Sequence, residues 1–128
     1  MQFTRVIPVL LLKNNGLVKT VKFKNSKYIG DPINAMKIFN TKEVDELVIL
    51  DIMATKNKRE PDYKFIKEIV SEAFMPIGYG GGVSELEHIR KLFQLGVDKV
   101  IINSAAILEP DLIKKASEIY GNQSIIVS

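Results

Sequence analysis

The sequence predicts an α/β fold in which four strand-then-helix units and a fifth strand form the front part of a parallel barrel. Apolar runs that are too short for helices alternate with segments of helical periodicity. The runs begin roughly 25 to 45 residues apart, which is the spacing that a parallel crossover requires. A complete eight-unit barrel needs about 250 residues, whereas this chain has 128. We therefore expect residues 1–128 to form one unit, the N-terminal portion of a larger barrel.

The first unit begins with the apolar run Arg5–Leu12, which is typical of a strand buried on both faces. A long basic loop is expected from Lys13 to Lys24. Within it Asn14-Asn15-Gly16 is a turn signal, and the residues after the turn half alternate like an exposed ribbon. Asp31-Pro32 then predicts the start of a helix, because an N-cap residue is followed by proline at the first helical position.

The later units have well-marked helix ends and no linker between them. Ser84 and Glu87 have the spacing of a capping box, and Gly96 and Gly121 stand where a left-handed residue ends a helix. Ser124–Ser128 reads as a further strand, with no turn or cap after it. We expect strands over residues 46–51, 75–78, 99–102 and 124–128, and helices over residues 62–74, 84–95 and 110–120.

Composition excludes several classes of function. The chain is 46% hydrophobic and 26% charged, and its 18 basic and 15 acidic residues are interspersed, unlike the basic stripe of a nucleic-acid binder. It has no cysteine, so disulfides and thiolate metal sites are excluded, and no apolar run is long enough to cross a membrane. We expect a cytoplasmic protein without a metal site. We also expect no cofactor, since the glycines lack the spaced dinucleotide-binding pattern.

Two predicted strands are followed by residues suited to a phosphate. Gly80, Gly81 and Gly82 follow the third strand and lead into a helix, so that backbone N–H groups and the helix N-terminus face the same space. Asn103 and Ser104 follow the next strand and add an amide and a hydroxyl. Because neighbouring parallel strands end at the same edge, we expect one phosphate site there. The plainer alternative for the glycines is a permissive turn.

Three other side chains are weighed as site residues. Asp51 ends the second strand and places a carboxylate at the mouth of the site, although such a residue is often only an N-cap. Lys19 belongs to the basic loop, where most lysines are merely solvated. His88 lies inside a predicted helix, and we expect it on the outer face without a role.

The opposite ends of the strands carry charges of both signs. Arg5 precedes the first strand, Glu46 opens the second, and Asp98 and Lys99 open the fourth. Unpaired buried charges are costly, so these residues are expected to pair as a plug. A gate or a docking surface is the alternative.

A set of segments along the whole chain carries a family signal. The segments are Arg5-Val-Ile-Pro8, the loop around Lys19, Gly30-Asp31-Pro32, Asp45–Asp51, Gly80–Val83, Gly96–Lys99 and Ile102–Ala106. Together they closely resemble HisF, the cyclase subunit of imidazole glycerol phosphate synthase in histidine biosynthesis. The resemblance implies a (βα)8 TIM barrel, of which four units and the fifth strand are present here.

The resemblance also implies how the substrate is bound. Gly82, with Gly81 beside it, Asn103 and Ser104 are similar to one of two phosphate sites for a bis-phosphorylated ribonucleotide. Lys19 matches a first loop that folds over the substrate, and Asp51 matches a polar residue that lines the pocket.

At the other end of the barrel the resemblance implies an ammonia gate. Arg5, Glu46 and Lys99 match members of a charged gate where ammonia enters from a glutaminase partner of the HisH type. Asp98 would face that partner.

One residue departs from the family pattern. The family's first strand reads Ile-Pro-x-Leu-Asp-x-Lys, in which the aspartate acts in acid–base catalysis, whereas this chain has Leu11 at that position. A leucine neither accepts nor donates a proton, and general acid–base catalysis contributes roughly a hundred- to ten-thousand-fold. We therefore assign no catalytic residue to this chain.

Leu11 leaves two alternatives to ring closure. The chain resembles HisF paralogues found with surface-polysaccharide genes, in which the barrel is thought to channel ammonia for the amidation of a sugar. In the other alternative it is a non-catalytic phosphate-binding half-barrel, which associates with a second copy through its exposed sheet edges and apolar inner face.

Overall fold

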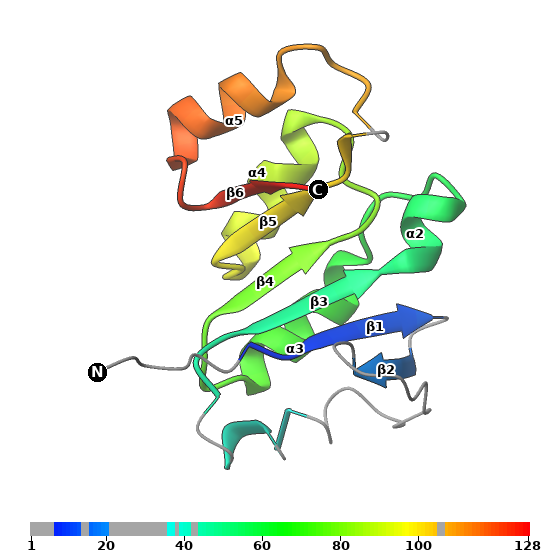
Figure 1. Cartoon of the computed structure of the whole chain (residues 1–128), viewed down its shortest axis with the longest axis vertical. Coiled ribbons are helices and arrows are strands. Elements are labelled where there is room, and N and C mark those ends of the chain that lie inside the picture. Colours follow the sequence, from blue (N-terminus) through cyan, green and yellow to red (C-terminus); the bar gives the residue numbers. More distant parts are fainter. Residues whose placement is uncertain (1–6, 14–15, 21–35, 38, 42–43, 105–106) are drawn as a thin grey trace.

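The computed structural model of the chain describes residues 7–13, 16–20, 36–37, 39–41, 44–104 and 107–128. Arg5 and the predicted helix start at Asp31-Pro32 lie outside these residues. The described part forms a six-stranded sheet with helices behind it (Figure 1). The strands are β1 (Val9–Lys13), β2 (Gly16–Thr20), β3 (Leu47–Asp51), β4 (Ile77–Gly80), β5 (Lys99–Ile102) and β6 (Ile125–Val127).

Five of the six strands are parallel, and they lie side by side in the order in which they occur in the chain. The sheet order is β2-β1-β3-β4-β5-β6, and only β2 is antiparallel to its neighbour. In this sequential order each strand is added to the same edge, as in a barrel, whereas a doubly wound sheet reverses its order. The connecting helices are α2 (Ile52–Lys56), α3 (Tyr63–Glu72), α4 (Leu86–Leu95) and α5 (Leu112–Tyr120).

The hydrophobic core lies between the sheet and the helices. Leu10, Ile49, Tyr79 and Val100 stand next to one another on successive parallel strands, and each is at most 1% exposed. The helices contribute the apolar residues of their inner faces to the same cluster. These are Ile66, Ile69, Ile89, Leu92, Leu112 and Ala116.

The other face of the sheet is apolar but less buried. Residues alternate between the two faces of a strand, so Leu11, Leu50, Gly80, Ile101 and Ile126 form a row across it, each next to its neighbour in the strand register. We call this the inner face, because it corresponds to the lumen side of a barrel. In Figure 1 no helix lies in front of it.

Several element boundaries differ from those predicted from the sequence. Strand β4 runs from Ile77 to Gly80 instead of over residues 75–78, so Gly80 belongs to the strand and not to the loop after it. The basic segment contains strand β2, which pairs with β1 and has a register shift between Leu11 and Leu12. The half-alternating pattern after Gly16 was therefore a real strand signal.

The capping-box prediction for Ser84 and Glu87 is wrong. Helix α4 begins at Leu86, and its N-cap, Glu85, has no side-chain capping bond. The backbone N–H of Ser84 instead donates to Nδ1 of His88 at 3.2 Å. At the other end of α4 Gly96 is left-handed, with φ 109° and ψ 10°, as predicted.

A short helical segment is described before β3. Met36, Lys37, Phe39 and Asn40 are helical. The Asn40 amide donates to the carbonyl of Glu72 and accepts from the N–H of Phe74, each at 2.9 Å, which joins this segment to the end of α3. Among the residues described, no helix has the length and apolar character needed to cross a membrane.

Candidate functional site

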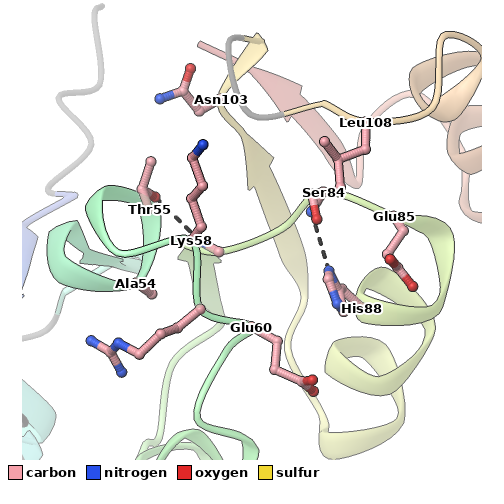
Figure 2. Close-up of a pocket in the computed structure, with 11 residues that line it drawn as sticks. Ala54, Thr55, Lys58, Glu60, Ser84, Glu85, His88, Asn103 and Leu108 are labelled. Carbon is pink, nitrogen blue, oxygen red and sulfur yellow. Dashed lines mark hydrogen bonds between the residues drawn. The ribbon is translucent and has the colours of Figure 1, made fainter.

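Two neighbouring pockets lie at the carboxyl ends of the parallel strands. The larger has a volume of about 570 Å³ and the smaller about 230 Å³. Thr55 and Asn103 line both. The larger pocket, drawn in Figure 2, is also lined by Ala54, Lys58, Arg59, Glu60, Gly82, Ser84, Glu85, His88 and Leu108. The smaller is also lined by Leu50, Asp51, Ile52, Gly80, Gly81, Ile101 and Ser128.

The glycine loop is shaped by close contact with the end of β3 and with the turn after α2. Gly81 and Gly82 have φ values of +133° and +71°. A Cβ atom on Gly82 would lie 2.0 Å from the carbonyl oxygen of Arg59, and one on Gly81 would lie 2.6 Å from that of Asp51. The N–H of Gly82 donates to Oγ1 of Thr55 at 3.3 Å. This amide is therefore already paired within the protein.

Tyr79, in strand β4, also stabilises the glycine loop. Its hydroxyl donates to the carbonyl of Gly81 at 3.1 Å. Burial raises the pKa of Tyr79 far above its ordinary value, and the nearby Asp51 carboxylate raises it further. Both effects favour the protonated hydroxyl, which is the form that donates to Gly81.

The structure places Asn103 in the wall of the larger pocket and Ser104 outside it. Asn103 lines the larger pocket together with Gly82, so the two predicted loops do meet at one cavity. Ser104 is outside both sets of lining residues, and its N–H donates to the carbonyl of Ser128 at 3.1 Å. Both residues are exposed.

Asp51 has a structural role that its position in the sequence left open. Its Oδ1 accepts from the N–H groups of Met53 and Ala54, at 3.1 and 3.0 Å, so it is the N-cap of helix α2. The residue is 5% exposed and lines the smaller pocket. Capping and pocket lining are thus combined in one carboxylate.

Helix α2 was absent from the sequence prediction, and together with the turn after it this helix supplies much of the larger pocket. Only five residues long, it ends in a Schellman motif, in which the N–H of Lys58 donates to the carbonyl of Thr55 and that of Arg59 to the carbonyl of Ala54. Lys58 has φ +54° and is the one non-glycine residue with positive φ in the described segments.

His88 was expected on an outer face without a role, and the structure places it differently. It is half-buried and lines the larger pocket. Because Nδ1 accepts the N–H of Ser84, the proton of the neutral ring is on Nε2. In Figure 2 the ring of His88 and Ser84 lie at the opposite side of the pocket from Thr55.

At the amino ends of the strands the predicted charge pairing is present. Nζ of Lys99 lies 3.1 Å from Oε1 of Glu46, and the Glu46 side chain is 6% exposed. The pair joins the starts of β3 and β5 across β4. A carboxylate oxygen of Asp98 accepts the N–H of Ile77 at 2.8 Å and so fastens β5 to β4. Arg5, the remaining predicted member, lies outside the described residues.

Comparison with known proteins identifies the family. The family model described as "Histidine biosynthesis protein" matches residues 5–128. The chain belongs to this family. It is 58% identical, over 97% of its length, to a Pseudomonas aeruginosa protein provisionally named imidazole glycerol phosphate synthase subunit hisF2, of which it covers 49%. It is 48% identical to a provisionally named HisF of Leptospira interrogans, over 97% of this chain and 49% of that protein.

The similarity extends to proteins named without qualification as subunit HisF. The example from Methanococcus maripaludis is 40% identical over 97% of this chain and 46% of its own length. The chain thus spans about half the length of the curated relatives it matches. Its five parallel strands and their helices are the N-terminal half-barrel portion of the histidine biosynthesis family's TIM barrel.

Within this histidine biosynthesis family fold, Leu11 lies on the inner face. It is half-buried, stands next to Leu50 of β3, and has Lys19 of β2 as its partner on the other side. The side chain of Lys19 lies outside what the structure describes. In the described segments no cluster of three or more histidine, aspartate or glutamate side chains could hold a metal ion.

The residues that the sequence interpretation missed come mostly from one connection. Thr55, Lys58, Arg59 and Glu60 follow Asp51 within ten positions. The signal that could have found them is Asp51 itself, because an aspartate at a strand end that is read as an N-cap implies a helix after it.

Proposed function

We propose that the protein is a HisF-like subunit of the imidazole glycerol phosphate synthase type, which uses ammonia from a glutaminase partner on a phosphorylated substrate. Membership of the histidine biosynthesis family and the names of the relatives support this proposal. The observation that carries it is the meeting of Gly82 and Asn103 at one pocket, where a phosphate would bind. We propose that the protein acts in the cytoplasm.

The proposed ammonia entrance is at the other end of the strands. Glu46 and Lys99 project to the inner face there and pair across β4. A charged pair that opens and closes would admit a small polar molecule while it keeps bulk water out, and Asp98 beside it would face the glutaminase. We propose that Arg5 and Lys19 complete the entrance and the substrate loop, respectively.

Leu11 favours a variant chemistry. A leucine on the inner face cannot supply the acid–base function that the family pattern assigns to this position, so we expect little ring closure. The second candidate function is therefore delivery of ammonia to a sugar acceptor. Both candidates share the glutaminase partner and the ammonia path, and they differ in the acceptor.

The test combines the protein with a HisH-type glutaminase and measures two rates, glutamine hydrolysis and formation of imidazole glycerol phosphate. Stimulated hydrolysis without cyclisation is the expected result. Leu11→Asp should raise the rate of cyclisation if the other catalytic groups are in place. Leu11→Asn is the matched control, because asparagine has the shape of aspartate but no acid–base function near neutral pH.

Two outcomes would contradict this proposal. Cyclisation by the unaltered protein at the rate of other HisF subunits would show that Leu11 does not limit the chemistry. Absence of any effect on the glutaminase would refute the ammonia-channelling role itself, and would leave the self-associating phosphate-binding half-barrel as the remaining candidate.

A further inference from the structure

Lys58 occupies a backbone position that suits it poorly. It is the C′ residue of the Schellman motif after α2, a position usually taken by glycine or asparagine. With φ +54° its Cβ crowds the backbone, which destabilises the folded state relative to glycine. Strained backbone positions of this kind gather at functional sites.

The charge of Lys58 is not used by the fold. Its side chain is exposed and makes no ion pair within the described segments, although Glu60 and Glu85 line the same pocket. In Figure 2 the side chain rises from the loop toward the end of the pocket that Asn103 lines. The contribution of Lys58 to the folded protein is thus a positive charge delivered into the larger pocket.

Two donors that the sequence suggested for the pocket are not open to a phosphate. The N–H of Gly82, which the sequence suggested as an anion donor, is already bonded to Thr55, and Ser104 is not in the pocket wall. A phosphate there would meet Asn103, Ser84 and His88 as polar neighbours, and Arg59 also lines the pocket as a second cation. Neutral donors bind an anion more weakly than a charged one does.

We propose that Lys58 is the cation that binds the substrate's phosphate in the larger pocket, and that its left-handed backbone aims the ammonium group there. This inference rests on the proposed phosphate site and names a further residue of it. Lys58 acts as a binding and positioning residue, because a phosphate distant from the reacting atoms fixes the substrate without taking part in bond making.

The test uses Lys58→Gly, because this change removes the charge and the backbone strain together. Isothermal titration with inorganic phosphate is carried out on the unaltered chain, Lys58→Gly, Lys58→Gln, Asn103→Ala and the control Lys56→Gln. Lys56 is an exposed lysine two positions away that does not line the pocket. Loss of a charge-assisted contact should weaken phosphate binding by roughly tenfold in both Lys58 variants, and Lys56→Gln should bind as the unaltered chain does.

Thermal unfolding separates a loss of binding from a loss of fold. Lys58→Gly should melt at the same temperature as the unaltered chain or higher, while it binds phosphate more weakly. If Asn103→Ala weakens binding and the Lys58 variants do not, the assignment of Lys58 is wrong and the phosphate site stands. If the unaltered chain binds no phosphate, both the site and the assignment are refuted.

Discussion

A methyl group on Gly82 would lie 2.0 Å from the Arg59 carbonyl oxygen, and the residue also has φ +71°. Its neighbour Gly81 is confined in the same way by Asp51. These two glycines therefore allow the loop after β4 to approach the end of β3 and the turn after α2, and Gly82 lines the larger pocket there. At the scale of single residues, close backbone contact explains the glycine run at least as well as access for a ligand does.

Gly82→Ala should consequently destabilise the protein by about 2 kcal/mol or more, since both the clash and the positive φ must be relieved. The measurement is urea unfolding, in which the midpoint falls while the slope is unchanged. Gly78→Ala is the matched control, because a Cβ atom there meets its neighbours at 3.4 Å or more and the backbone is that of a normal strand. Equal losses in the two variants would contradict this account.

Helix α2 shows what one element contributes to the site. It is five residues long, begins at the Asp51 cap and ends at the Lys58 turn, and the pocket lies against it. A helix this short is not stable by propensity alone. Its two ends, which satisfy the backbone groups that a helix leaves unpaired, therefore decide whether it forms.

Asp51→Ala should cost about 1 to 2 kcal/mol of unfolding free energy, because two backbone N–H groups lose their acceptor in a nearly buried place. Asp51→Asn keeps an oxygen in the same position and should recover most of the loss. Hydrogen exchange of the Met53 and Ala54 amides reports the effect directly. Unchanged protection of both amides in Asp51→Ala would show that the cap does not hold the helix.

Strand β5 and helix α3 could be predicted from the sequence, whereas α2 was missed for a physical reason. Strand β5 and the Asp62 cap of α3 follow from apolar runs and capping residues near in sequence. Residues 52–56 carry no full helical period, so the Asp51 cap is the local signal that remains, and an aspartate at a strand end can equally be a turn residue. The pocket was likewise half predicted: Gly82 and Asn103 follow strands, whereas His88 lies in the first turn of α4, which begins at Leu86, and was expected on an outer face.

Across the whole molecule, the two ends of the strands carry different features. The carboxyl ends of the strands carry both pockets, and the amino ends carry the Glu46–Lys99 pair and the Asp98 bond to β4. The edges differ too. The antiparallel strand β2 lies beyond β1, so the edges of the described sheet are β2 and β6, each paired on one side only. Self-association through these sheet edges stays a prediction.

The pair between Glu46 and Lys99 can be measured with a double-mutant cycle of Glu46→Gln and Lys99→Met. We expect a coupling of about 1 to 2 kcal/mol, because one partner is nearly buried and the other is 31% exposed. The coupling should fall when salt is raised, since the lysine side is open to screening. A coupling near zero at low salt would mean that the two charges are solvated separately.

Thr55 and Asn103 each line both pockets. A guest in one pocket that displaced either side chain would therefore change the wall of the other pocket as well. A molecule long enough to reach into both would be selected by its length in addition to its chemical groups.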